Sequence, residues 1–177
     1  MMTLGILGGG QLARMLCLDA KRMGVRTVVW SGTPTAESTE GVADLVLKRN
    51  FDDVEAHEEF CHQVDVATVE FENIPLETLR AVEEAVGLYP SAESIGVSQH
   101  RSREKTFFRE HGIPCAPFML VNSFAELEVA YEEIGPDTVL KTAAFGYDGK
   151  GQVKITSVDE LEAAWESVRG EPSVLEG

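Results

Sequence analysis

The sequence predicts an α/β protein whose first half is a parallel sheet covered by helices on both faces. Short apolar runs alternate with longer segments of helical spacing between residues 3 and 86, at a pitch typical of βαβ units. Glycines stand directly after the first apolar run, where a strand would turn into a helix. A polar stretch at residues 91–108 then precedes a second set of strands and helices, which indicates a connection between two domains.

The first half contains an ordered series of expected strands and helices. Residues 3–7 form an apolar run that ends in glycines, as buried parallel strands do. Residues 11–23 have apolar side chains at helical spacing, and Gly24 ends this helix. The other expected elements are strands at 26–30, 45–47 and 64–69, a loop at 31–40, and helices at 52–63 and 75–86.

The second half begins with one or two polar helices at residues 91–108. Ser123 and Ser157 suit helix N-caps, because each has a glutamate three residues on, as in a capping box. The expected elements are strands at 118–121, 138–141, 152–155 and from 173 onward, with helices at 123–134 and 157–168. Because the chain stops directly after its last strand, we expect the second domain to be incomplete.

Composition excludes several classes of protein. The chain has 177 residues, is 44% hydrophobic and 25% charged, and carries a formal net charge of −15, which opposes binding to nucleic acid or anionic membranes. Its start lacks the pattern of a signal peptide, and no apolar run approaches the roughly 20 residues that span a bilayer. Three separated cysteines without zinc-ligand spacing favour reduced thiols, so we expect a cytoplasmic protein.

The turn after the first strand places Gly8, Gly10 and Ala13 in a GxGxxA pattern. Such a turn aims backbone N–H groups and a helix N-terminus at one point, which suits an anion. Dinucleotide binding is disfavoured, because the second strand ends in Trp30 and Ser31 without an acidic residue for a ribose. The alternative is that these glycines only permit a tight turn.

Two further segments carry candidate polar ligands. Glu70 and Glu72 follow the fourth strand, and in extended chain both would point to one side, at a strand end where ligands bind. A solvated strand end is an equal alternative. Lys141 ends an apolar strand and precedes a glycine-rich loop at 146–151, whose backbone amides could wrap a triphosphate. The alternative is a hairpin with a plain Asp-Gly turn, which the three glycines and the lysine make less favoured.

Three motifs in order resemble those of one superfamily. They are GILGGGQLARM at 5–15, TVEFENIP at 68–75 and LKTAAFGYDGKGQV at 140–153, with RSREKTFFREHGIPCAP at 101–117 between the last two. Over essentially its whole length the chain resembles the ATP-grasp superfamily and, within it, the family of 5-(carboxyamino)imidazole ribonucleotide synthases. The resemblance implies a Rossmann-like pre-ATP-grasp domain at 1–98. It also implies the linker helix and the small α+β lobe of an ATP-grasp domain at 99–177, truncated at its C-terminus.

The resemblance also implies an activity. Such enzymes use ATP to phosphorylate bicarbonate. The resulting carboxyphosphate, or the carbon dioxide that it releases, is captured by the exocyclic amine of 5-aminoimidazole ribonucleotide (AIR) in purine biosynthesis. Shielding a short-lived acyl phosphate from water requires a loop that closes over the phosphates. The implied cofactors are ATP and Mg²⁺, and the implied whole enzyme is a homodimer with small-molecule substrates and neither nucleic-acid nor membrane partners.

The resemblance assigns residues to two sites. The implied ATP-binding residues are Arg101, Lys141, Gly146, Tyr147, Asp148, Gly149, Lys150, Gly151, Gln152 and Glu176. The residues implied to line the AIR pocket are Gly10, Gln11, Leu12, Glu72, Tyr147 and Lys150. Lys105 matches a recurring lysine of the linking helix, for which a structural role is expected.

The chain departs from the family pattern at two positions. His100 stands where an acid usually precedes Arg101, and Ala13 stands where glycine is common. Catalytic residues and Mg²⁺ ligands are expected beyond Gly177, so we expect this chain alone not to turn over. Two alternatives stay open: another ATP-grasp enzyme, such as formate-dependent glycinamide ribonucleotide transformylase, or a non-catalytic nucleotide-binding module.

Overall fold

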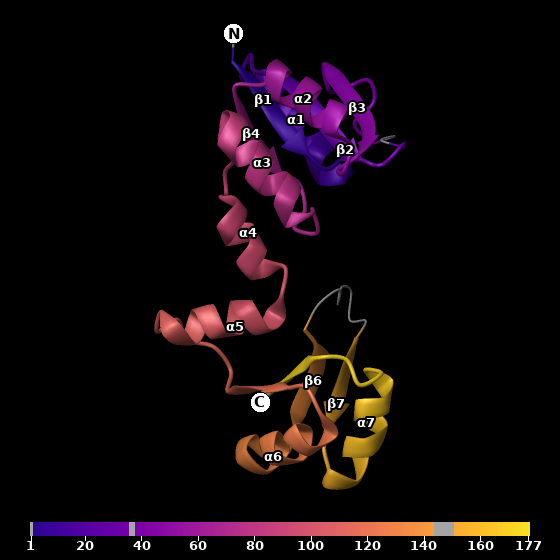
Figure 1. Ribbon diagram of the computed structural model, residues 1–177, viewed down its shortest axis with the longest axis vertical. Helices are drawn as coiled ribbons and strands as arrows, with labels where there is room; N and C mark the ends of the chain where they lie inside the picture. Colours follow the sequence, from indigo (N-terminus) through magenta and orange to yellow (C-terminus); the bar gives the residue numbers. More distant parts are fainter. Residues whose placement is uncertain (1, 36–37, 144–150) are drawn as a thin grey trace. The chain divides into compact units, whose positions relative to one another are not determined.

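A computed structural model describes residues 2–35, 38–143 and 151–177. The chain forms two compact units, Met1–Gly96 and Val97–Gly177. Each unit has its own sheet and its own hydrophobic core (Figure 1). Within the described ranges, no helix is both long and apolar enough to cross a membrane.

The first unit is built on a four-stranded parallel sheet. Its strands are β1 (Thr3–Leu7), β2 (Arg26–Gly32), β3 (Leu45–Asn50) and β4 (Val66–Val69), in the order β3-β2-β1-β4. In register, Leu7 pairs with Trp30 on one side and with Val69 on the other. The carboxyl ends of these strands therefore meet at one edge of the sheet, where open α/β sheets bind ligands.

Helices cover both faces of this sheet, as the sequence predicts. They are α1 (Gln11–Arg22), α2 (Val54–Gln63) and α3 (Leu76–Val86), and α4 (Ala92–Ser98) follows. Under α1, Ala13 and Cys17 pack against Ile6 and Val29. The other face buries the larger core, whose members include Leu7, Val28, Trp30, Phe60 and Leu79. Neighbouring strand residues thus point to opposite faces and fill two separate cores.

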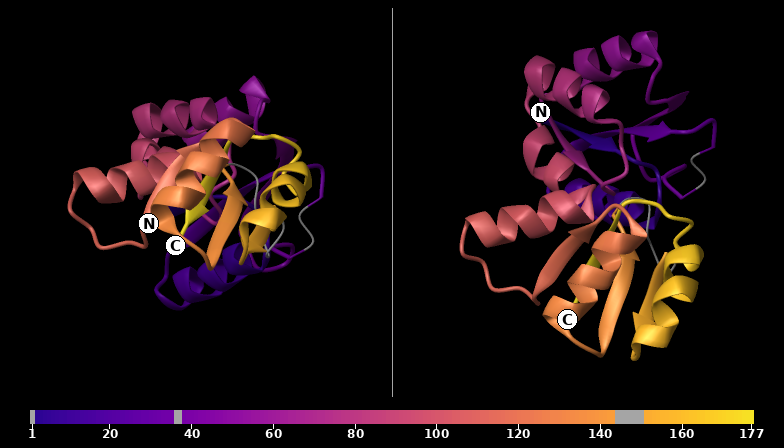
Figure 2. Two further views of the ribbon diagram at one scale, coloured as in Figure 1. Left: turned by 90° about the horizontal axis from the view of Figure 1, so that it is seen from below. Right: turned by 60° about the horizontal axis from the view of Figure 1, so that its bottom comes forward.

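The second unit contains a four-stranded antiparallel sheet with the order β5-β8-β6-β7. Its elements are α5 (Arg101–Glu110), β5 (Phe118–Val121), α6 (Phe124–Ile134), β6 (Thr138–Thr142), β7 (Gln152–Ile155), a 3₁₀ turn at Val158–Glu160, α7 (Leu161–Ser167) and β8 (Ser173–Glu176). Helices α6 and α7 lie side by side along the sheet (Figure 2). They bury a core with Leu140 and Leu175, which confirms the predicted α+β lobe.

Lys141 and Glu176 lie on the other face of this sheet. Leu140 pairs with Leu175 and faces the core under α6 and α7. Because side chains alternate along a strand, the next residue of each strand points away from that core. The alternation therefore places Lys141 and Glu176 on the same face, opposite that core, where α5 contacts β8.

Several boundaries differ from the sequence prediction for local reasons. Ser31 belongs to β2 rather than to a loop, because β2 continues to Gly32 through a register shift. Residues 157–168 form a 3₁₀ turn followed by α7 instead of one helix. At Ser157 both hydrogen bonds of the expected capping box are present. At the other expected capping box, Glu126 instead accepts from the backbone N–H of Asn122, at 2.8 Å.

Two candidate ligand sites

The first unit has a pocket of about 510 Å³ at the carboxyl edge of its sheet. The turn between β1 and α1, the end of β2 and the end of β4 contribute to it. Its lining residues are Gly9, Gly10, Ser31, Thr33, Thr35, Ser38, Glu70 and Phe71. Five of these eight residues carry a hydroxyl or carboxylate group, which suits a ligand with several hydrogen-bonding groups.

The glycine turn lets the Glu70 side chain approach the start of α1. Gly8 has a φ of 109°, a conformation that favours glycine, and its N–H donates to the Trp30 carbonyl at 2.8 Å. A methyl group on Gly10 would collide with the Glu70 carboxylate. Gly10 is the N-cap of α1 and offers no side-chain acceptor, so the carboxylate lies close to the positive end of this helix.

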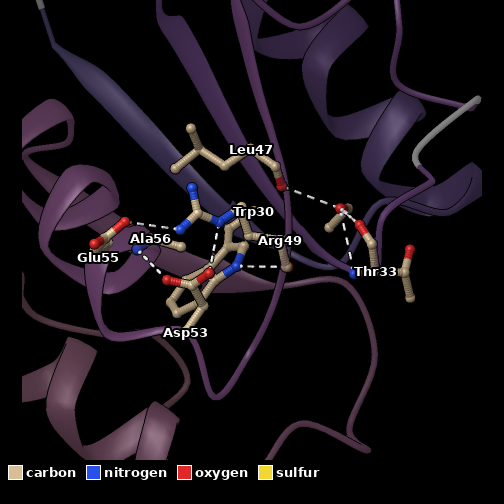
Figure 3. Close-up of polar contacts among 8 residues, drawn as sticks. Trp30, Thr33, Leu47, Arg49, Asp53, Glu55 and Ala56 are labelled. Carbon is tan, nitrogen blue, oxygen red and sulfur yellow. Dashed lines mark hydrogen bonds and ion pairs between the residues drawn. The ribbon is translucent and has the colours of Figure 1, made fainter.

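Hydrogen bonds hold the hydroxyl-bearing segment after β2 in place (Figure 3). The Ser31 hydroxyl lies 2.7 Å from the Thr33 carbonyl and 3.1 Å from the Leu47 carbonyl, either of which accepts its proton. The Trp30 indole N–H donates to the Arg49 carbonyl at 2.9 Å. The Arg49 guanidinium in turn pairs with Asp53 at 2.6 Å, next to the start of α2.

Helix α1 also contacts the hydroxyl-bearing segment that follows β2. The Gln11 amide donates to the Ser38 hydroxyl at 3.3 Å, and the Arg14 guanidinium donates to the Ser38 carbonyl at 3.1 Å. Gln11 thus contacts one of the lining residues, although it is not itself among them. Leu12 is 58% exposed and is not among the lining residues either.

Glu70, not Glu72, lines the pocket. Strand β4 ends at Val69, so the alternation that would place both glutamates on one side does not extend to them. Glu72 is exposed and bonds to the Asn73 amide at 3.3 Å. Sequence reasoning also missed the hydroxyl residues Ser31, Thr33, Thr35 and Ser38, although the Ser- and Thr-rich composition of residues 31–40 was a usable signal.

The second unit has a cluster of charges around the Glu176 carboxylate. Its Oε2 atom accepts from Lys141 Nζ at 2.8 Å and lies 3.1 Å from Lys105 Nζ. Arg101 Nε lies 4.0 Å from Oε1. Glu176 is only 7% exposed. Burial alone would raise the pKa of its carboxyl, but the hydrogen bonds from Lys141 and Lys105 outweigh it and leave that pKa below its usual value.

Helix α5 is tied to the end of β6 beside this charge cluster. The backbone N–H of Arg101 donates to the Ala143 carbonyl at 2.7 Å, and its guanidinium donates to the Thr142 carbonyl at 2.9 Å. Gly151, with a φ of 71°, accepts from the Thr142 N–H at 2.8 Å and directly precedes β7. Gln152 pairs with Lys141 across the two strands.

Five of the predicted ATP-binding residues, Gly146, Tyr147, Asp148, Gly149 and Lys150, lie outside the described residues. Those described are Arg101, Lys141, Gly151, Gln152 and Glu176. Gly151 and Gln152 lie opposite the end of β6, and the side chains of Arg101 and Lys141 meet that of Glu176. Three cations surround one carboxylate there, which leaves two positive charges in excess and suits a polyanion. In the described ranges no three carboxylate, imidazole or thiol side chains gather closely enough to hold a metal ion, so we assign none of these residues to Mg²⁺.

Comparison with known families identifies the first of these two units. Residues 1–99, which make up more than half of the chain, match the model of the ribonucleotide synthetase pre-ATP-grasp domain. The chain belongs to this family. Residues 106–177, which include Lys141 and Glu176, match the ATP-grasp domain, and Arg101 and Lys105 lie between the two matched ranges.

Named relatives agree with this family. The chain is 42% identical over 169 residues to the bifunctional purine synthesis protein purC/E of Dictyostelium discoideum. This alignment covers 96% of this chain and 17% of that protein. It is 38% identical over 180 residues to N5-carboxyaminoimidazole ribonucleotide synthase of Brucella melitensis. This alignment covers 99% of this chain and 49% of that enzyme. The chain therefore spans about half the length of the synthase that it matches.

Solved structures show the same fold. The N5-carboxyaminoimidazole synthetase of Staphylococcus aureus complexed with ADP is 31% identical, with a TM-score of 0.91 over 99% of this chain and 47% of that one. The Aspergillus clavatus enzyme in complex with ADP and 5-aminoimidazole ribonucleotide is 28% identical, with a TM-score of 0.85 over 99% and 46%. The chain shares with these enzymes the fold of both of its units.

Proposed function

We propose that the whole protein carboxylates 5-aminoimidazole ribonucleotide with bicarbonate and ATP in purine biosynthesis. One observation carries the proposal: the chain matches N5-carboxyaminoimidazole ribonucleotide synthases over 99% of its length, including a structure solved with ADP and the aminoimidazole ribonucleotide. A bicarbonate oxygen attacks the γ-phosphorus of ATP and displaces ADP. The substrate amine then attacks the carbon of carboxyphosphate, releasing phosphate and a proton and giving the N-carboxyamino product.

In this proposal the pocket of the first unit binds AIR. Gly10 lines it and Gln11 contacts its lining residue Ser38, and we add Glu70 to the expected set because it lines the pocket beside the glycine turn. Serine and threonine hydroxyls donate to phosphate oxygens, and the Glu70 carboxylate accepts from sugar hydroxyls or an amine. Leu12 and Glu72 retain an assignment from family resemblance alone, as do Tyr147 and Lys150.

The charge cluster of the second unit binds ATP in this proposal. Lys141 and Arg101 neutralise phosphate oxygens, and Glu176 holds Lys141 beside the last strand. The assignment extends to the loop from Gly146 to Gln152. ATP-grasp chemistry also calls for Mg²⁺, which lowers the charge of the triphosphate when bound, and the described residues offer no ligand set for it.

Two measurements test the proposal. The 177-residue chain should bind ATP and AIR in separate calorimetric titrations, and Glu70→Gln should weaken AIR binding but not ATP binding. The complete gene product should release ADP only when bicarbonate and AIR are both present, and ¹³C-bicarbonate should label the product. ADP release that follows formate with glycinamide ribonucleotide would instead support the transformylase alternative, and binding of nucleotide without any turnover would support a non-catalytic module.

Three properties of the whole protein complete the proposal. We place the boundary between the two domains at residues 98 and 99. We propose a homodimer on the family resemblance, which light scattering of the complete gene product tests. Three free cysteines, Cys17, Cys61 and Cys115, support a reducing compartment, and we propose the cytoplasm, which fractionation of the native cells tests.

A further inference from the structure

One carboxylate oxygen in the second unit serves two lysines from different elements. Oε2 of Glu176 lies 2.8 Å from Lys141 Nζ, on β6, and 3.1 Å from Lys105 Nζ, on α5. The Lys105 side chain is 12% exposed and that of Lys141 is 23% exposed. Oε1 of Glu176 is buried and has no hydrogen-bond partner among the described residues. The proposed function assigns Lys141 a phosphate ligand, whereas it assigns Lys105 no ligand.

We propose that Lys105 is a positioning residue for ATP binding, which holds Glu176 so that Lys141 is free to turn toward a phosphate oxygen. The inference rests on the proposed function, because it requires a nucleotide phosphate as the alternative partner of Lys141. It assigns Lys105 a role in ligand affinity instead of the structural role that the sequence analysis expects of it.

The reason is the cost of leaving a buried carboxylate unpaired. Breaking a buried ion pair by removing one partner is strongly unfavourable, because the remaining charge stays desolvated without compensation. When Lys141 moves from Glu176 to a phosphate, Lys105 still pairs with the same oxygen. Without Lys105, the same movement would leave Glu176 with no hydrogen bond at either oxygen, and ATP would have to overcome that cost.

Arg101 does not replace Lys105 in this arrangement. Its Nε atom lies 4.0 Å from Oε1 of Glu176, which is too long for a hydrogen bond. Its guanidinium already donates to the Thr142 carbonyl at 2.9 Å, and its backbone N–H donates to Ala143. Arg101 is therefore held toward the end of β6 while Lys105, one helical turn further along α5, reaches the carboxylate.

A purely structural role for Lys105 predicts different results. In that case Lys105 only fastens α5 to the sheet, and its removal lowers the stability of the second unit without a loss of ATP affinity in the protein that remains folded. A positioning role predicts that the loss of ATP affinity depends on the charge of Glu176. The two roles are separated by a double-mutant cycle, which measures the coupling of two residues.

The cycle compares ATP binding by calorimetry in the wild-type chain, Lys105→Met, Glu176→Gln and the double variant. Methionine keeps the aliphatic length of lysine and removes its charge. We expect Lys105→Met to weaken ATP binding by about tenfold or more in the wild-type background. In the Glu176→Gln background we expect a change of less than about twofold, because no bare carboxylate is left behind. Lys105→Arg should restore most of the affinity.

A matched control lies on a neighbouring strand. Lys154 on β7 has a side chain that is 63% exposed and pairs with Asp137 at 3.1 Å. Lys154→Met removes the same charge from the same unit and should leave ATP affinity unchanged. If Lys105→Met does not fold, Lys105→Gln replaces it, and thermal unfolding of each variant shows that the folded proteins are being compared.

The outcomes separate this inference from the proposed function. An equal loss of affinity in both backgrounds, or no loss in either, would overturn the positioning role while ATP binding by the wild-type chain still stands. Absence of ATP binding by the wild-type chain would overturn the proposed function and this inference with it. A second readout needs no nucleotide: NMR titration of the Glu176 carboxyl should give a higher pKa in Lys105→Met than in the wild type, and an unchanged pKa would exclude action through Glu176.

Discussion

Lys141 illustrates how a single side chain acquires a role from its place in a strand. It ends the apolar run of β6, and its neighbour Leu140 is fully buried in the core of the second unit. Alternation turns Lys141 to the opposite face, where Glu176 lies at 2.8 Å. Lys141 is therefore held by Glu176 without being enclosed by the hydrophobic core. A lysine can bind a phosphate only if its ammonium group stays outside the core in this way.

Replacing Lys141 by methionine should abolish most ATP-dependent turnover while the fold is kept. The change removes a cation that the proposed function places on the phosphates, and we expect a loss of about a hundredfold or more in kcat/KM for ATP. Steady-state kinetics of the complete gene product measure it, with circular dichroism as the test of folding. Wild-type ATP usage in Lys141→Met would remove Lys141 from the site.

Replacing Gly10 by alanine should weaken AIR binding more than it weakens the fold. A methyl group at this position meets the Glu70 carboxylate, and that carboxylate is the end of a flexible side chain that is able to move aside. We expect AIR affinity to fall by about tenfold with little change in unfolding temperature. Gly8→Ala offers a contrast, because its φ of 109° makes any side chain strained, so the unfolding temperature should fall as well.

At the scale of elements, the hairpin of β6 and β7 determines where the glycine-rich segment begins and ends. Lys141 pairs with Gln152, and the Thr142 N–H donates to Gly151 at 2.8 Å. Helix α5 is hydrogen-bonded to the end of β6 through Arg101. Its guanidinium donates to the Thr142 carbonyl and its backbone N–H donates to the Ala143 carbonyl. Ala143 and Gly151 are therefore both held by backbone hydrogen bonds next to the charge cluster.

Gly151→Ala should disturb this anchor. Gly151 has a φ of 71°, and a methyl group there would lie 2.5 Å from the Thr142 hydroxyl, so the substitution is strained in two ways. We expect a loss of about 1–2 kcal/mol in the free energy of unfolding and weaker ATP binding. Chemical denaturation and calorimetry measure the two effects. Gly135→Ala is the matched control, since its φ is 100° but no atom lies within 4 Å of the added methyl, and it should lower stability without weakening ATP binding.

Element positions were largely predictable from local sequence, and their exact ends were not. The strands at Thr3–Leu7 and Gln152–Ile155 have the predicted bounds, because apolar runs and flanking glycines are local signals. Strand β2 continues through Ser31 to Gly32 because β3 supplies hydrogen-bond partners there, and no feature of the β2 sequence itself reveals that pairing.

At the scale of the whole molecule, each unit has its own core and its own chemistry. The first unit buries Trp30 and Phe60 in one core, and the second buries Leu140 and Leu175 in another. The hydroxyl-lined pocket belongs to the first unit, and the lysine–carboxylate cluster belongs to the second. Changes at the two sites should therefore affect different ligands, as the variants proposed here test.

The stability of the second unit should depend on acidic pH through Glu176. Its folded-state pKa is lowered from a usual value of 4.5, so its contribution to stability is fully present above that value and is lost as the pH falls through the folded-state pKa. We expect the unfolding temperature to fall with decreasing pH below about 4.5, and Glu176→Gln to reduce that dependence.

Thermal unfolding monitored across a pH series measures this dependence. Glu133→Gln removes an exposed carboxylate of α6 and serves as the control for general charge effects in the same unit. A pH profile in Glu176→Gln that is parallel to the wild-type profile would show that the ion pairs of Glu176 do not contribute to acid sensitivity.

The sequence by itself determined the α/β fold class, the order of elements, and the identity of the residues that bear charge or permit tight turns. These properties depend on neighbours in the chain: apolar alternation, helical spacing, caps and glycines. It also pointed to Gln11, Lys141 and Glu176 as binding residues through resemblance to a family.

Only the tertiary structure decided which of these side chains meet. Glu70 faces the glycine turn while Glu72 is exposed, because β4 ends one residue before Glu70. Lys105 and Lys141 share one oxygen of Glu176 because the antiparallel register of β6 and β8 and the packing of α5 bring three distant segments together. Such meetings depend on strand register and packing between elements, which local sequence patterns do not encode.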